Sequence, residues 1–182
     1  MTFFRHPSPG RPVIRALAAS LLVAALASCA AGPAGHANLA GAAAALNAGQ
    51  TDPAFQQPYI DVDEWRNAPQ RHRYVHGGFR GTDTRFSFYY PESATYQGRF
   101  FQHVTPTPDS ENLAQGEWQG EEDKLGFALD SGAYYVETNG GGSGRTARSD
   151  SDSTITAYRA NAAAAQFSRV VAAQVYPGKQ RP

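Results

Sequence analysis

The chain has 182 residues, in which 16 Lys and Arg residues balance 16 Asp and Glu residues. Residues 1–28 contain three of the basic residues and no acidic one, so the remainder has 13 basic and 16 acidic residues and a net charge of −3. This mildly acidic remainder argues against a nucleic-acid-binding protein, which needs a basic surface. The single cysteine excludes an internal disulfide framework and a cysteine-based zinc site.

The first 28 residues have the pattern of an export signal. Three arginines precede an apolar run over residues 16–27, and about a dozen apolar residues are too few for a membrane-spanning helix of roughly 20. The run ends in Leu26-Ala27-Ser28-Cys29, which resembles the bacterial lipobox, whose cysteine is lipidated and becomes the N-terminus. We predict a lipoprotein signal peptide over residues 1–28 and lipidation of Cys29. A plain secretory signal with an incidental cysteine is the alternative.

The next segment, residues 29–57, is predicted to be a tether. Residues 30–50 are almost wholly Ala, Gly and a few polar residues, a composition that cannot build a core. The predicted partner is therefore the membrane, reached through lipidated Cys29, and the predicted location is the cell envelope. Ala30 in place of Asp resembles outer-membrane lipoproteins, periplasmic or surface-facing, if the source is Gram-negative.

Residues 58–182 are predicted to form the folded domain, beginning with two antiparallel strands. Residues 59–65 contain alternating acids without the spacing of a calcium loop, so a surface segment anchored by Trp65 is expected there. Strands are expected over residues 73–76 and 84–90, because aromatic and polar residues alternate in the second run.

Strands alternating with helices are expected in the rest of the domain. Residues 98–104 and 133–138 are short apolar runs that predict buried strands, and acids ahead of Leu125 predict a helix that ends at Gly132. A long helix is predicted over residues 155–176, with one apolar stripe formed by Ala160, Ala163, Ala164, Phe167, Val170, Val171 and Val175. This order predicts an α/β fold, with antiparallel first strands followed by parallel strands alternating with helices.

The order of motifs resembles the N-terminal half of an α/β-hydrolase, and more narrowly the tannase/feruloyl-esterase-like branch. The similarity covers about residues 71–182. It rests on Pro91 leading to Gly-Arg-Phe, on Gly-Phe-Ala-Leu-Asp-Ser-Gly-Ala-Tyr-Tyr-Val-Glu-Thr-Asn over residues 126–139, and on Tyr-Arg-Ala-Asn over residues 158–161. The resemblance implies that residues 58–182 are an incomplete domain of this type.

The same resemblance implies a serine ester hydrolase, but the nucleophile is missing. In the family the nucleophile sits on a G-x-S-x-G elbow after the long helix, and the chain has no such frame; Ser143 comes nearest and is expected to be a loop residue. What the resemblance leaves is half of an oxyanion hole, with His103, Val104 and Thr105 as the oxyanion-loop candidates. A hydrogen-bonded histidine at a strand end is the alternative for His103.

Other polar motifs are expected to be structural. His76-Gly77-Gly78 looks like an oxyanion motif of lipases but lies a strand pair too early, so a hairpin bend is expected; as metal ligands, His72 and His76 would be about 13 Å apart in a strand. Asp150 and Asp152 could bind calcium, and a solvated loop with Ser153 as the helix cap is the favoured interpretation. No metal, no cofactor and no nucleic-acid partner is predicted.

Two functions remain open from the sequence. The chain could be the N-terminal part of a lipid-anchored ester hydrolase, inactive alone, whose substrate would be a small ester. It could instead be a non-catalytic binding or structural lipoprotein of the envelope. Whether the chain is an enzyme is left undecided, because no complete catalytic triad is recognisable.

Overall fold

The computed structural model describes Leu39 and residues 50–104, 109–116, 120–142 and 152–179. All described residues belong to one compact unit, which lies within residues 35–182. Cys29, Thr105, Ser143 and Asp150 lie outside the described residues. Within the described part, no helix combines the length and the apolar character that crossing a membrane requires.

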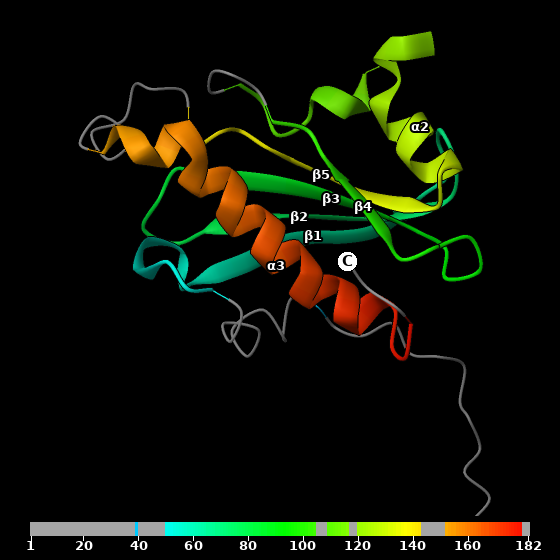
Figure 1. Ribbon diagram of the computed structural model, residues 1–182, viewed down its shortest axis with the longest axis horizontal. Coiled ribbons are helices and arrows are strands. Elements are labelled where there is room, and N and C mark those ends of the chain that lie inside the picture. The colour runs from blue at the N-terminus through cyan, green and yellow to red at the C-terminus, as the bar shows by residue number, and fades with distance from the viewer. Residues whose placement is uncertain (1–38, 40–49, 105–108, 117–119, 143–151, 180–182) are drawn as a thin grey trace, which may run out of the picture. The chain divides into compact units, whose positions relative to one another are not determined.

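The domain has a mixed α/β fold built on a five-stranded sheet (Figure 1). The strands are β1 (Pro58–Arg66), β2 (His72–Phe79), β3 (Arg85–Pro91), β4 (Arg99–Gln102) and β5 (Ala133–Thr138). Their order across the sheet is β1-β2-β3-β5-β4. The pairs β1–β2, β2–β3 and β3–β5 are antiparallel, and β4–β5 is parallel. The predicted α/β class and the predicted change from antiparallel to parallel pairing are confirmed.

Strand β1 was not expected, because residues 59–65 were predicted to be a surface segment. Its acids do not form a metal site but pair across the strands: Asp63 accepts two hydrogen bonds of 2.7 Å from Arg73. The register of β1 against β2 shifts between Ile60 and Val62, which brings the backbone of β1 against Gly77. A Cβ at Gly77 would lie 2.0 Å from the carbonyl oxygen of Tyr59, so glycine serves this close approach and not the predicted hairpin bend.

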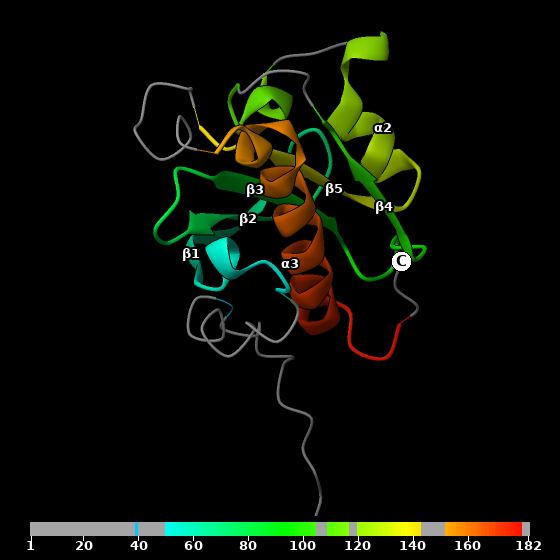
Figure 2. The ribbon, with the colours of Figure 1, turned by 60° about the vertical axis from the view of Figure 1, so that its left-hand side comes forward.

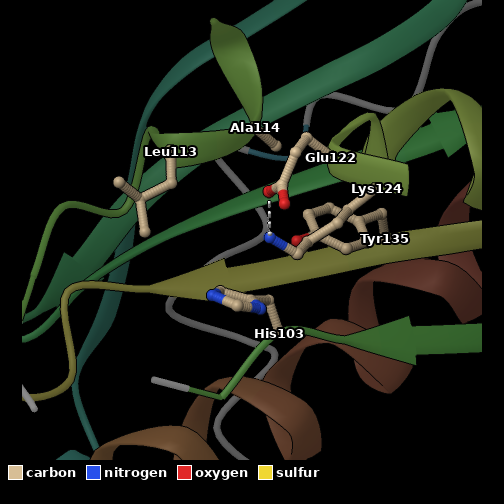
Figure 3. Close-up of a pocket in the computed structure, with 6 residues that line it drawn as sticks. All are labelled: His103, Leu113, Ala114, Glu122, Lys124 and Tyr135. Carbon is tan, nitrogen blue, oxygen red and sulfur yellow. Dashed lines mark ion pairs between the residues drawn. The ribbon is translucent and has the colours of Figure 1, made fainter. Parts of the chain in front are cut away.

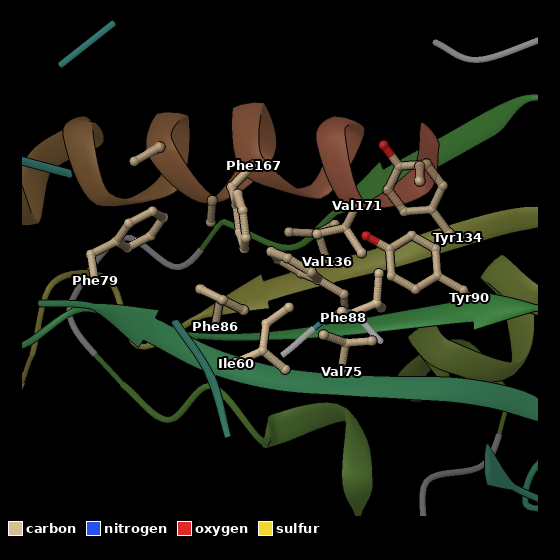
Figure 4. Packing of buried hydrophobic residues seen from close by; sticks show 14 of the residues in the cluster. Ile60, Val75, Phe79, Phe86, Phe88, Tyr90, Tyr134, Val136, Phe167 and Val171 are labelled. Carbon is tan, nitrogen blue, oxygen red and sulfur yellow. The ribbon is translucent and has the colours of Figure 1, made fainter. Parts of the chain in front are cut away.

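Helix α3 (Ala160–Val175) covers one face of the sheet (Figure 2). Its predicted apolar stripe is confirmed, since Phe167 and Val171 are fully buried among side chains of β2, β3 and β5 (Figure 4). The Phe86 and Phe88 rings are stacked with centroids 4.3 Å apart, and Phe167 packs against both. This aromatic layer is the main core of the domain.

Helix α2 (Lys124–Asp130) covers the opposite face, together with the 3-10 turns η3 (Leu113–Gln115) and η4 (Gly120–Glu122). Because of this second layer, β3 is buried on both faces and not half-buried as predicted. The helix begins at Asp123, whose carboxylate accepts a hydrogen bond from Gly126 N–H at 2.7 Å, and the other acids precede it in η4. Gly132, with φ +67°, ends the helix as predicted.

The folded part begins earlier than the boundary predicted at residue 58. The turn η2 (Pro53–Phe55) buries Phe55 against Phe79 at 5.2 Å between ring centroids. Asp52 also accepts two hydrogen bonds from Arg159, at 2.7 and 2.8 Å. These contacts could not be predicted from the residues up to 57, because both depend on partners more than twenty residues away.

Residue Arg159 belongs to η5 (Ile155–Arg159), a π-helical turn that opens the long helix. The prediction that Ser153 caps this helix is wrong. Asp152 Oδ1, and not Ser153, accepts the hydrogen bond from Thr154 N–H, at 3.0 Å. Asp152 also pairs with Arg159, so its oxygens are bound within the chain.

Candidate functional site

The connections around β4 and β5 create a crevice at one edge of the sheet. Strand β4 leads through α2, on one face, into β5, and β5 leads into α3, on the other face. Helices that leave neighbouring parallel strands toward opposite faces define a topological switch point, where ligands bind at the carboxyl ends of the strands. His103, directly after β4, and Asn139, directly after β5, mark this position.

Two depressions that share His103, Lys124 and Tyr135 lie there, with volumes of about 140 and 240 Å³. The first is completed by Leu113, Ala114 and Glu122 (Figure 3). The second is completed by Phe101, Gln102 and Phe127. The Phe101 and Phe127 rings are stacked at 5.6 Å and partly exposed. The site therefore combines an exposed aromatic wall with a few polar groups.

The strand that carries part of this wall was predicted to be buried. Instead, β4 is an edge strand with alternating exposed and half-buried residues. Its inner side pairs with β5, and among the described strands none pairs with its outer side. Of its two phenylalanines, Phe101 lines the site, and Phe100 packs half-buried against the main core.

The polar groups of the site include the ammonium of Lys124 and the imidazole of His103. Lys124 Nζ is 3.6 Å from Glu122 Oε2 (Figure 3), an exposed ion pair of a kind that contributes about 0–1 kcal/mol. The ammonium is therefore free to turn toward a ligand. Burial, and then the charge of Lys124, lower the pKa of His103, so its ring is uncharged at neutral pH and can accept a proton.

The structure distinguishes the predicted oxyanion-loop candidates. The backbone N–H of His103 donates to Val136 O at 2.9 Å and extends the pairing of β4 with β5. The backbone N–H of Val104 has no hydrogen-bond partner among the described residues. Thr105 lies outside them. Of the two described candidates, only Val104 has a backbone donor that sheet pairing leaves available.

The histidines of β2 lie away from the crevice. His76 hydrogen-bonds Asp61 at 2.5 Å and contacts Glu111 at 3.4 Å, while His72 is buried at the start of the strand. No group of three or more His, Cys, Asp or Glu side chains within the described ranges is placed to hold a metal.

Glu137 is a buried carboxyl group that sequence reasoning missed. It is 1% exposed, and it accepts hydrogen bonds from Tyr89 OH at 2.6 Å and from Ala114 N–H at 3.1 Å. Burial raises its pKa to about 7. The alternation of side chains along β5 could have revealed it, because residues two apart in a strand share a face. Glu137 therefore lies on the same face as Tyr135 of the site. Glu137 thus holds η3, one wall of the first depression, against the sheet.

Among the described residues that line the two depressions there is no serine, threonine or cysteine to act as a nucleophile. The described site can bind an organic molecule, donate hydrogen bonds to its oxygen atoms and accept a proton. Covalent attack on a carbonyl group would need a residue from outside this set.

None of the protein-family models compared with the chain matches it, and no curated protein matches it. Among solved structures, the chain is similar to a tannin acyl hydrolase from Aspergillus niger, with a TM-score of 0.47 and 16% sequence identity. The similarity covers 74% of this chain and 29% of that enzyme, so this chain spans less than a third of the enzyme's length. This is a distant likeness of fold and carries no argument about activity.

Proposed function

We propose that the chain is an exported lipoprotein, anchored to the cell envelope through Cys29, whose domain forms the ligand-binding part of an ester-hydrolase-type site. The crevice at the switch point carries this proposal. It joins a positive ammonium and a neutral imidazole beside two exposed aromatic rings. The backbone N–H of Val104, the residue after His103, has no partner among the described residues. Such a set suits a small aromatic ester or carboxylate, with its ring on the phenylalanines and its oxygens toward Lys124.

A non-catalytic binding lipoprotein is the second candidate. Among the described residues, neither depression is lined by a serine, threonine or cysteine, which favours it. The two candidates differ in the reading frame after the codon for Pro182. A continuing frame that encodes a strand and G-x-S-x-G favours the hydrolase, and a stop codon favours the binding protein.

Lys124→Met is expected to weaken binding of benzoate to the full chain about tenfold. The substitution keeps the length of the side chain and removes the charge that faces the carboxylate, and a tenfold loss corresponds to about 1.4 kcal/mol. Calorimetric titration of the detergent-solubilised protein measures the affinity. Lys179→Met is the matched control, because Lys179 contacts Ser93 O, outside the residues that line the crevice.

If both lysine variants lost the same affinity for benzoate, the assignment of the crevice as the binding site would be wrong. The same preparation is expected to leave p-nitrophenyl acetate intact and to remain unlabelled by a fluorophosphonate. Serine-dependent turnover by this chain would show that a nucleophile is present, and the proposal of a binding part without one would then be wrong.

Cys29→Ser is expected to move the protein from the membrane fraction to the soluble fraction. Two or more acyl chains on a lipidated cysteine bind a bilayer stably, because each buried methylene contributes about 0.8 kcal/mol. Fractionation and metabolic labelling with a palmitate analogue measure the effect, and Ser28→Ala keeps a small residue before the cysteine as the control. Retention of the Cys29→Ser variant in the membrane would overturn the lipid anchor but not the crevice.

A further inference from the structure

A second cavity lies beside the crevice, on the face of the sheet that α2 and η3 cover. It has a volume of about 390 Å³ and is lined by the ends of β1 and β3, the start of β2, η3 and the start of α2. Its polar lining includes Arg66, His72, Gln115 and Asp123. Of the residues that line the crevice, only Ala114 also lines this cavity. The cavity is within the size range of small-molecule sites.

His72 is the unexplained group in this cavity. Its side chain is 1% exposed, and its Nδ1 is 2.7 Å from Gln70 O, a carbonyl that can only accept a hydrogen bond. Nδ1 therefore carries the proton, and Nε2 is left as an acceptor. Nε2 is buried and has no hydrogen-bond partner among the described residues. Buried polar groups without a partner are rare in native proteins, so a missing donor is indicated.

The other polar groups of the cavity offer both donors and acceptors. Arg66 uses Nε for Glu64 and Nη1 for Gln115 and makes no hydrogen bond from Nη2 to a described residue. Its guanidinium lies 3.4 Å from the centroid of the Tyr74 ring, which holds it in place. Asp123 uses Oδ1 for Gly126 N–H and keeps Oδ2 as an acceptor. One positive and one negative group balance each other, so a charged ligand would face a group of its own sign.

We propose that this cavity binds a small neutral polyol. A hydroxyl group both donates and accepts, so neighbouring hydroxyls can donate to His72 Nε2 and Asp123 while accepting from Arg66. Pro69 and Leu125 provide apolar contacts for the carbon skeleton. The burial that lowers the pKa of His72 keeps the ring neutral and its Nε2 an acceptor.

The test is titration of the full chain, labelled with ¹⁵N-histidine, with myo-inositol as the probe. In the free protein the His72 Nε2 resonance is expected at the position of a bare imidazole nitrogen. Saturable addition of myo-inositol should move it upfield, as for a nitrogen that accepts a hydrogen bond, while the His103 resonances stay in place. Arg66→Met is expected to weaken binding about tenfold without loss of folding, because Arg66 is partly exposed.

His72→Phe keeps an aromatic ring at the site and removes the acceptor, and it should also weaken binding about tenfold. His103→Phe is the matched control in the other site and should leave the affinity for myo-inositol unchanged. The proposal is overturned if the His72 Nε2 resonance already shows a hydrogen bond in the free protein and does not move when myo-inositol is added. The donor to Nε2 would then be an ordered water only. It is also overturned if Arg66→Met binds myo-inositol as tightly as the wild type.

Discussion

Phe167→Ala is expected to lower the free energy of unfolding by about 3–5 kcal/mol, the usual cost of removing a buried phenylalanine ring. Phe167 is fully buried in the layer between α3 and the sheet. Its ring centroid lies 6.0 Å from that of Phe79, 5.5 Å from Phe86 and 6.1 Å from Phe88. Three rings would therefore face the cavity that the substitution leaves. Urea unfolding followed by circular dichroism measures the change.

Phe127→Ala is the matched control for this prediction. The Phe127 side chain is 66% exposed and contacts Phe101 on the surface of the site. Its loss is expected to change the free energy of unfolding by less than about 1 kcal/mol, as is usual for surface positions. If both phenylalanine variants lost the same stability, the layer under α3 would not be the main core of this domain.

The second large effect is expected at Glu137, where replacement by Gln should remove most of the loss of stability between pH 4.5 and pH 7. Burial raises the pKa of this carboxyl from its ordinary value of 4.5 to about 7. Between these values the folded protein binds the proton more tightly than the unfolded chain does. Stability therefore falls as the pH rises through this range, by about 3 kcal/mol in total. Glutamine stays neutral and keeps a carbonyl oxygen for the hydrogen bond from Tyr89.

Urea unfolding of the wild type and of Glu137→Gln at pH 5 and pH 8 measures the difference. Glu92→Gln is the control, because Glu92 is a half-exposed partner of Arg71 and should leave the pH dependence nearly unchanged. If Glu137→Gln and the wild type changed in stability by the same amount between pH 5 and pH 8, the assignment of a buried, easily protonated carboxyl to Glu137 would be contradicted.

His76 contributes to the same pH range in the same direction. The hydrogen bond with Glu111 is the main cause that raises the pKa of His76. Its stabilising contribution is complete below the ordinary value of 6.5 and is lost as the pH rises through the pKa of the folded state. Glu111, whose pKa the same contact lowers, titrates below 4.5 and does not affect this range. His72 and His103, whose pKa values burial lowers, act in the opposite direction, because their contribution is lost as the pH falls below 6.5. The loss of stability with rising pH that remains in Glu137→Gln is therefore expected above pH 6.5.

Local patterns along the chain were sufficient to predict most of the elements of the fold. Period two in residues 84–90 and the apolar run 133–138 correspond to β3 and β5, and the apolar stripe with Phe167 identified α3 and its buried face. These signals are local, because the burial of a side chain on one face repeats with the period of its own element. For the same reason the α/β class and the parallel pairing of the later strands could be predicted.

The position of His103 at the end of a strand was also expected, but the crevice beside it was not. Lys124, Tyr135 and Phe127 come from α2 and β5, and their approach to His103 depends on where the crossover places α2 on the sheet. The spacing of these residues along the chain does not predict how close they lie to His103 in space.

The sequence alone therefore predicted most of the secondary-structure elements and the α/β class of the fold, which are read from neighbouring residues. Only the tertiary structure decided that residues 59–65 form a strand, that β4 lies at an edge, and that His103 N–H is used in sheet pairing. It also decided that Glu137 and His72 are buried, one with partners and one with an unpartnered nitrogen. The physical reason is that burial, desolvation and hydrogen-bond partners are properties of contacts between distant segments.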